Sequence, residues 1–465
     1  MRNGFLGARS FIGVALVSLG ISLACNRVAT AEVDKLEPLV QRIDQLESEV
    51  QHLREGPVPL PALSDSLVQP CSGCSNFYSS SQAANYPTIA LGGFFQADWG
   101  WFDQDAVNLA TVGDIQDGAD FRRARLNTHG DAWENVGYMV EFDFAFSGRP
   151  SFMDVYMELR DLPLLGAVRI GQWRQPFGMD GQTSVKELTF LERGLPFAFL
   201  PFRQIGLGFH NHSQDENMTW AASMFRFPTD TFGGNVGDNG GYALATRVTA
   251  LPWRNEDGTR LLHFGAGYSF GDPANDKVRY RNQPEFFVSE TGGADLIPAG
   301  VPTSVPPFVD TGSIATTNFN LFATEGGLVL GSLYLQSEAI YALVNQTGGP
   351  NLSFSGAYAM AGYFLTGEVR PYNRKTGVFG RVKPLNNFGS GSGYGAWELA
   401  TRWSYIDLND KNIAGGRLND VTLGLNWYLN PRTKFQFNYI HAFLDSPAFG
   451  ESDADILAWR GQVDF

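Results

Sequence analysis

Cysteine, positive charge and long apolar runs are all scarce in this chain of 465 residues. The net charge of −14 argues against nucleic acid as a partner. Beyond the N-terminal region, no apolar run is long enough for a transmembrane helix. After the leader only Cys71 and Cys74 remain, too few for a structural zinc site and without a thioredoxin-like context. We therefore expect no cofactor or metal, and a disulfide between these two cysteines, within one chain or between chains.

Glycine and aromatic residues, in contrast, are abundant. The chain has 53 glycines and 36 phenylalanines, and aromatics make up 13% of it. Glycine at turns and aromatics at membrane interfaces are typical of transmembrane β-barrels. The same composition also fits a large secreted all-β protein. Composition alone therefore does not distinguish this class from a transmembrane barrel.

The first 86 residues divide into three segments. Residues 1–31 combine two arginines, an apolar stretch and Ala-Thr-Ala at 29–31, which predicts a signal peptide cleaved before Glu32. A lipoprotein cleaved before Cys25 and an uncleaved anchor helix are the alternatives. Apolar residues at steps of three and four predict a short periplasmic coiled-coil helix over 32–55, the alternative being an amphipathic helix packed on its own domain. Residues 56–86, rich in proline and serine, form a linker that contains Cys71 and Cys74.

From residue 87 to 465 the chain alternates apolar and polar residues in strand-length segments. In the last segment Leu457, Trp459 and Val463 share one face of an extended strand, whereas Arg460 and Asp464 share the other. A transmembrane barrel needs this pattern, because lipid covers the apolar face and the lumen accepts the charges. A two-layer sandwich would give the same alternation.

The number and spacing of these segments favour the barrel. We expect sixteen strands, an all-β antiparallel transmembrane barrel wide enough for a water-filled lumen. Connections alternate between tight turns and long polar loops, except that the long segment 370–394 falls on the short-turn, periplasmic side. The expected starts are near residues 88, 119, 137, 151, 167, 203, 218, 240, 260, 318, 332, 354, 396, 420, 434 and 457.

Several segments resemble the phosphate-selective porin O and P family, and together they cover nearly all of 87–465. They are DFRRARL at 120–126, EFDF at 141–144, IGQWRQPFG at 170–178, FLERGLP at 190–196, QIGLG at 204–208, GVFGRV at 377–382, GAWELA at 395–400 and GLNWYLNP at 424–431. The resemblance implies a homotrimeric outer-membrane channel of a Gram-negative-type bacterium, often anion-selective, with small ions and solutes such as phosphate as cargo. The terminal Phe465 likewise resembles the signal read by the barrel assembly machinery.

A pore needs a constriction and an electric field inside it rather than catalytic groups. In sixteen-stranded porins the third extracellular loop usually folds inward, and here it spans 179–201. Alternation places further arginines on the lumen face, where they would form a ladder of anion contacts. Carboxylates should face the same lumen, so the charges could simply cross-link the wall, and Glu192 and Arg193 could form a local ion pair. The candidates for pore lining and anion contact are Arg123, Arg125, Arg169, Lys186, Arg193, Arg247, Arg402 and Arg460.

The sequence is compatible with three functions. The first is a passive diffusion channel, preferring anions if the arginines dominate. The second is a structural tether, with the coiled coil reaching a periplasmic partner. The third is an outer-membrane hydrolase, but none of the histidines at 129, 210, 212, 263 and 441 lies beside an obvious nucleophile motif, so no catalytic residue is expected.

Overall fold

The computed structural model describes Gln45 and residues 86–145, 150–229, 240–290 and 305–465. The predicted signal peptide, the predicted coiled coil apart from Gln45, and the linker with Cys71 and Cys74 lie outside the described residues. The unit Ala83–Phe465 is compact and contains the barrel.

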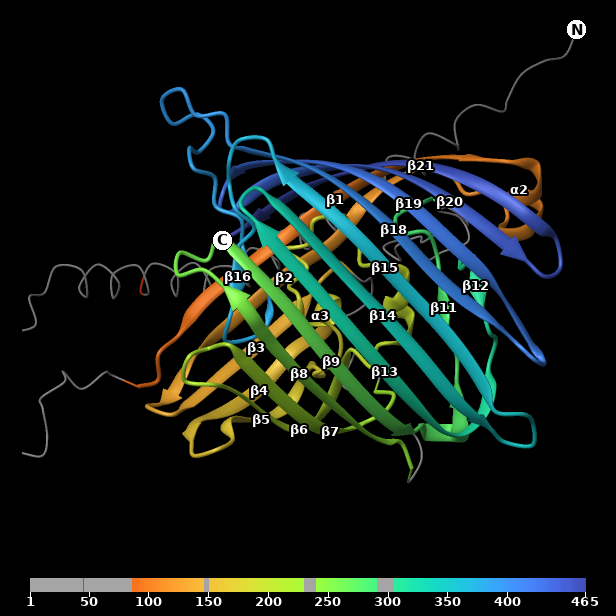
Figure 1. Ribbon diagram of the computed structural model, residues 1–465, viewed down its shortest axis with the longest axis horizontal. Coiled ribbons are helices and arrows are strands. Elements are labelled where there is room, and N and C mark those ends of the chain that lie inside the picture. Colours follow the sequence, from red (N-terminus) through yellow and green to blue (C-terminus); the bar gives the residue numbers. More distant parts are fainter. Residues whose placement is uncertain (1–44, 46–85, 146–149, 230–239, 291–304) are drawn as a thin grey trace, which may run out of the picture. The chain divides into compact units, whose positions relative to one another are not determined.

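Sixteen long antiparallel strands form a closed barrel, which confirms the predicted all-β architecture (Figure 1). Each strand pairs with its neighbours in chain order, and β1 pairs with β21 to close the sheet. The strands are β1 (Ala90–Gln104), β2 (Gly118–Trp133), β3 (Val136–Asp143), β4 (Ser151–Leu162), β5 (Gly166–Arg174), β6 (Arg203–His212), β7 (Met218–Arg226), β8 (Tyr242–Arg254), β9 (Arg260–Asp272), β13 (Ile314–Leu330), β14 (Leu333–Gln346), β15 (Leu352–Phe364), β18 (Ala396–Asp410), β19 (Ile413–Asn430), β20 (Thr433–Ser446) and β21 (Gly450–Asp464).

Short helices and strands lie in the connections between these long strands. None of the described helices is long and apolar enough to cross a membrane. The short elements are α2 (Ala106–Val112), α3 (Met179–Gln182), η1 (Leu195–Phe199), η2 (Ala274–Asp276), β10 (Lys277–Val278), β11 (Arg281–Asn282), β12 (Val309–Asp310), β16 (Tyr372–Asn373) and β17 (Val378–Phe379).

The two ends of the barrel differ in their connections. One end carries tight turns, such as 134–135, 331–332 and 431–432, and we assign it to the periplasm. The opposite end carries long loops, including 105–117 and 273–313. The segment 365–395, between β15 and β18, is the long connection at the periplasmic end, as the sequence predicted.

Most strands begin within a few residues of their predicted starts, but β19 and β21 begin earlier, at Ile413 and Gly450 rather than near 420 and 457. Glycine and polar residues interrupt the apolar alternation in the first residues of both strands. Backbone pairing nevertheless continues there, with Asp410 opposite Ile413 and Ser446 opposite Gly450. The ladder thus extends beyond the membrane-facing pattern.

The outer face of the barrel is apolar and its periplasmic rim is aromatic. In β21 the Leu457 side chain is 55% exposed and Arg460 is 0% exposed, which confirms the predicted faces of the last strand. Trp99 stacks on Trp459 across the seam of the barrel, and Trp397 stacks on Trp427. Trp397 and Trp427 lie next to the periplasmic ends of β18 and β19, where tryptophan is typical of the aromatic girdle at a membrane interface.

The inside of the barrel is not uniformly polar. From β13 to β21 most inward residues near the extracellular end are apolar, for example Leu321, Ile340 and Leu444, all at most 2% exposed. They pack against Phe199 of the loop after β5 and Phe286 of the loop after β9. The sequence pattern had predicted charged and polar residues on this face. Apolar packing therefore fills the lumen along this wall, and open space remains along β2–β8.

Candidate pore constriction

Loop 3, which we define as residues 175–202 between β5 and β6, folds into the barrel as expected. The inner wall holds it through its main-chain carbonyls. Lys434 Nζ donates to the carbonyl oxygen of Leu188 at 2.9 Å, and Asn426 Nδ2 and Gln436 Nε2 donate to that of Thr189 at 2.7 and 2.9 Å. Three strand side chains thus fix the middle of the loop across the lumen.

A β-bulge in β2 points two consecutive arginines inward. Gln96 of β1 pairs with Arg123, but the next residue, Ala97, pairs with Phe121, so Arg122 is the extra residue. A bulge of this kind breaks strict alternation and redirects a side chain. Alternation had placed Arg123 and Arg125 in the lumen but missed Arg122. The only signal in the sequence is the Arg-Arg pair itself, since an arginine facing lipid is costly.

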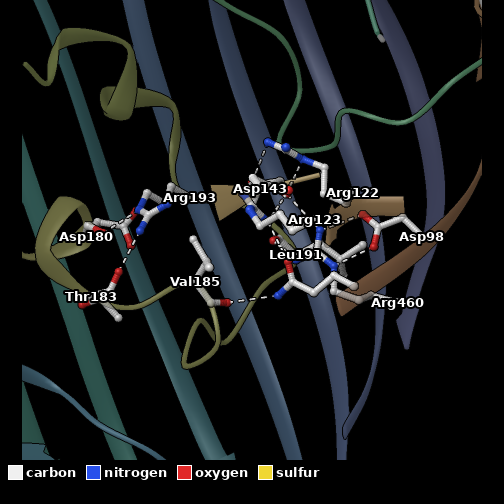
Figure 2. Close-up of polar contacts among 12 residues, drawn as sticks. Asp98, Arg122, Arg123, Asp143, Asp180, Thr183, Val185, Leu191, Arg193 and Arg460 are labelled. Atoms are coloured by element: carbon white, nitrogen blue, oxygen red, sulfur yellow. Dashed lines mark hydrogen bonds and ion pairs between the residues drawn. The ribbon is translucent and has the colours of Figure 1, made fainter. Parts of the chain in front are cut away.

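Three guanidinium groups converge on the carboxylate of Glu192 in loop 3. Glu192 Oε1 accepts hydrogen bonds from Arg122 Nε at 2.9 Å, Arg123 Nη1 at 3.0 Å and Arg460 Nη2 at 2.9 Å. Arg123 Nη2 reaches Oε2 at 2.8 Å. Figure 2 shows the three arginines turned toward one another, with Asp98 beside Arg460. The suggested local pair between Glu192 and Arg193 is wrong, because each side chain binds other groups.

This arrangement fixes the charge of Glu192. Burial alone would raise the pKa of the carboxyl group, but Arg122, Arg123 and Arg460 together lower it well below its usual value. Arg460 also donates to both carboxylate oxygens of Asp98, at 2.6 and 2.7 Å. The cluster therefore contains three cations and two anions, and Glu192 remains ionised at neutral pH.

Arg193 and Arg174 are bound by main-chain carbonyls instead. Arg193 donates to the carbonyl oxygens of Asp180 at 2.6 Å and Thr183 at 2.7 Å (Figure 2). Arg174 donates to those of Gln182 and Thr183, both at 2.8 Å. Neither guanidinium forms an ion pair with a carboxylate in the described part of the chain. Burial lowers the pKa of Arg193 to about 9, so it still carries its charge at neutral pH. Asp180 lies near Arg193 and Asp154 near Arg174, so each charge still interacts through space with one carboxylate.

The remaining predicted arginines lie inside the barrel, and each contacts an acidic side chain. Lys186 is partly exposed, with Nζ 3.9 Å from an Asp464 oxygen. Charges in the predicted ladder are therefore largely compensated, as the wall-cross-linking alternative anticipated. The pairs are Arg125 with Asp143, Arg169 with Glu158, Arg247 with Glu325, Arg402 with Glu285 and Arg460 with Asp98.

Two cavities lie along the open side of the lumen. The first, of about 370 Å³, is bounded by β2–β6 and loop 3 and is lined by Arg122, Arg123, Arg125, Arg193, Arg203, Asp143, Glu192 and Glu285 together with apolar and amide side chains. The second, of about 120 Å³, is bounded by β5–β8 and is lined by Arg169, Arg174, Arg247, Lys375 and His210 among others. Arg203, which was not among the predicted pore-lining residues, pairs with Asp154 at 2.8 Å.

The periplasmic segment, which we define as residues 365–395, also folds inward. Arg247 Nη1 and Nη2 donate to the carbonyls of Thr376 and Gly377 at 3.0 and 2.7 Å. Gly377 has a φ of +66°, and a Cβ there would lie 2.7 Å from Thr249 Oγ1, so only glycine fits this approach. Arg381 bridges Glu187 of loop 3, at 3.1 Å, and Asp464, at 2.6 Å. This explains the length of the segment: it closes on loop 3 from the periplasmic end.

Comparison with known proteins agrees with this architecture. Residues 89–465 match the family described as phosphate-selective porin O and P. Porin O of Pseudomonas aeruginosa is 25% identical over 403 residues, which cover 81% of this chain and 88% of that protein. An uncharacterized protein of Caulobacter vibrioides is 28% identical over 334 residues, which cover 69% of this chain and 62% of that relative.

Solved structures show weaker likeness. OmpT of Vibrio cholerae in its trimer form has 11% identity and a TM-score of 0.46, covering 81% of this chain and 99% of that one. The anion-selective porin from Comamonas acidovorans has 12% identity and a TM-score of 0.45, with coverage of 81% and 99%.

Proposed function

The chain belongs to the phosphate-selective porin O and P family, and we propose that it conducts small anions across the outer membrane in preference to cations. As a member of this family it is an outer-membrane porin, a passive channel for small solutes. The preference for anions, with phosphate as the first solute to test, is the part that we propose.

The charge of the residues lining the two cavities is the observation that carries this proposal. Around the first cavity five arginines face three carboxylates. Around the second cavity three arginines and one lysine face no lining carboxylate. A narrow passage lined by one sign of charge, with low-dielectric walls, concentrates ions of the opposite sign. Ion pairing reduces this field, but the lining of each cavity still contains more cationic than acidic side chains.

The apolar filling along β13–β21 strengthens this effect. It leaves permeating solutes next to the inner wall of β2–β8, which carries the arginines of both cavities. A solute in such an eccentric path lies nearer to the guanidinium groups than one on the axis of an open barrel. Electrostatic interaction rises as distance falls, so the excess positive charge acts at close range.

A channel without ion preference is the second candidate. Its support is the regular pairing of lumen arginines with carboxylates, such as Arg125 with Asp143 at 2.7 Å and Arg402 with Glu285. In that case the charges would stiffen the wall and hold loop 3, and the field along the path would be close to neutral. The sign of the reversal potential distinguishes the two candidates.

The hydrolase alternative receives little support. The stretch GYSFG at 267–271 fits the Gly-x-Ser-x-Gly pattern, but that motif works as a sharp strand-to-helix turn that exposes the serine. Here it lies within β9, where Ser269 Oγ donates to the carbonyl oxygen of Leu244 at 2.7 Å. The nearby His263 contacts Tyr372 and Glu325 instead. A serine and its base are therefore not brought together at this motif.

We propose in addition that the protein assembles as a homotrimer and that the segment 32–55 adds to its association. The family resemblance and the heptad spacing of that segment support this. A role of the same segment as a tether to a periplasmic partner is compatible with channel function.

Recording in planar lipid bilayers tests the proposal. Purified protein should give discrete conductance steps, and in a KCl gradient the reversal potential should shift toward the equilibrium potential of chloride. Replacing chloride by phosphate should leave a measurable current. A small neutral sugar should reduce the conductance only by displacing electrolyte from the pore. A reversal potential at zero, or one shifted toward that of potassium, would contradict the anion preference while leaving the channel itself intact.

A further inference from the structure

The three-arginine cluster at the constriction has the chemistry of an oxyanion site, yet a side chain of the protein occupies it. Arg122, Arg123 and Arg460 place their N–H groups around the two oxygens of Glu192, at 2.8 to 3.0 Å. Guanidinium groups bind carboxylates and phosphates through the same planar fork of donors. The donor set is thus as suited to a permeating oxyanion as to Glu192.

The occupied position adjoins the path that solutes would take. Glu192 and the arginines Arg122 and Arg123 line the first cavity, whose volume of about 370 Å³ is large enough for a small hydrated anion. Arg460 closes the far side of the cluster and is held there by both oxygens of Asp98, at 2.6 and 2.7 Å. An anion that enters the cavity therefore meets the arginines from the side on which Glu192 lies.

We propose that Glu192 acts as a tethered anion: its carboxylate occupies a three-arginine oxyanion site, so that small oxyanions such as phosphate pass the constriction without being retained. This inference rests on the proposed anion conduction and names the residue that limits anion binding beside the first cavity. Conduction requires a site that attracts an ion and still releases it. Three unoccupied guanidinium groups would attract an oxyanion strongly, whereas three groups shared with a fixed carboxylate attract it only through their residual charge.

The arrangement differs from an ordinary anchoring salt bridge in one respect. A single arginine would suffice to hold loop 3 at Glu192, and the loop has independent anchors at Leu188 and Thr189. Three arginines on one carboxylate leave a net positive cluster even after Asp98 is counted. Removal of the Glu192 charge should therefore create a binding site rather than merely free the loop.

The test compares wild type with Glu192→Gln and Glu192→Ala in planar bilayers. The measured quantity is the chloride current as inorganic phosphate is added at constant ionic strength. Either variant should show half-block at a phosphate concentration about tenfold or more below that of wild type, since two or more charge-assisted hydrogen bonds become available to the ion. Glu192→Asp, which keeps the charge, should stay near wild type.

Glu398→Gln is the matched control. It removes one buried carboxylate from β18, but Glu398 is bound by Tyr334, Asn426 and Tyr428 rather than by arginines, and it lines neither cavity. Its phosphate sensitivity should equal that of wild type.

The possible results separate this inference from the proposed function. Anion preference in wild type with no new phosphate block in Glu192→Gln or Glu192→Ala would overturn the tethered-anion proposal alone. New block in both variants from a wild type without anion preference would support the tethered anion and contradict the preference. If neither variant gives a folded, heat-modifiable barrel, Glu192 is required for folding and the proposal fails. Equal sensitization by Glu398→Gln would also overturn it, because the effect would then follow net charge rather than the site.

Discussion

Arg247 and Glu325 face each other inside the barrel from β8 and β13, with guanidinium nitrogens 2.8 and 2.7 Å from the two carboxylate oxygens. The same guanidinium donates to the carbonyls of Thr376 and Gly377 in the periplasmic segment. One side chain thus connects the wall of the barrel with the periplasmic segment, which contacts loop 3 from the periplasmic end.

Replacement of Arg247 by alanine should therefore affect both stability and conductance. Glu325 would remain buried without its cation, which costs about 3–5 kcal/mol when a buried pair is broken from one side. The periplasmic segment would lose two hydrogen bonds, and single-channel conductance should rise as it loosens. Urea unfolding followed by tryptophan fluorescence measures the first effect and bilayer recording the second.

Arg417→Ala provides the control for this experiment. Arg417 pairs with Asp407 but its side chain is 44% exposed, and such a pair contributes at most about 1 kcal/mol. If Arg247→Ala loses stability while its conductance stays at the wild-type value, then other contacts, such as those of Arg381, hold the periplasmic segment in place.

The double variant Arg123→Ala plus Arg125→Ala tests the origin of the anion preference. Both arginines line the first cavity, and their removal leaves Glu192 and Asp143 with fewer cationic partners. The local field then becomes two charges more negative, so the reversal potential in a KCl gradient should move toward that of potassium. An unchanged reversal potential would assign the preference to other residues, first of all Arg174 and Arg193.

Most of the barrel was predictable because lipid imposes a strict rule on each strand. The outward residues must be apolar, so alternation in segments such as 457–464 identifies strands, faces and the strand count. Inside the barrel no such rule applies. Leu321, Ile340 and Leu444 are apolar, like residues that face lipid, although they face inward. Loop residues such as Phe286 shield them from water.

The constriction was predictable only in part, for a related reason. Alternation identified Arg123, Arg125 and Arg460 as inward residues, but a bulge adds Arg122, for which the adjacent arginines are the only local signal. The arginine partners of Glu192 could not be predicted either, because loop 3 contacts β2 and β21, whose contacting residues lie about 70 and 268 positions away in the chain. Contacts between residues far apart in the chain depend on topology that the sequence pattern does not encode.

The charge of Glu192 gives a prediction about pH. Its folded-state pKa lies well below the unfolded value of 4.5, so ionised Glu192 stabilises the folded barrel above pH 4.5 and loses that contribution as pH falls through the folded-state pKa. The difference in unfolding free energy between wild type and Glu192→Gln should therefore be constant from neutral pH down to about pH 5 and shrink in more acidic solution. A difference that begins to shrink near neutral pH would show that the arginines do not hold the carboxylate in its charged form.

Deletion of residues 32–55 tests the division of labour between the N-terminal segment and the barrel. The segment precedes the barrel in the chain, and its heptad spacing predicts a coiled coil. We expect subunit association to weaken, seen as a lower dissociation temperature of the oligomer on native gels, with unchanged conductance per pore. A large loss of conductance would show that this segment takes part in the channel itself.

The terminal aromatic residue gives the last prediction, which concerns assembly. Phe465 exchanges two main-chain hydrogen bonds with Gly93 at the seam, both at 3.0 Å, and its ring is 55% exposed. Phe465→Ala keeps these main-chain bonds but removes the ring, so the folded barrel should lose little stability. If the ring is what the barrel assembly machinery reads, the variant should accumulate less heat-modifiable protein in outer-membrane fractions, and Phe465→Tyr should restore it. Channels that do assemble should conduct like wild type, because the ring does not line either cavity. Equal amounts of folded alanine variant and wild type would leave recognition to the remainder of β21, whose alternation is unchanged.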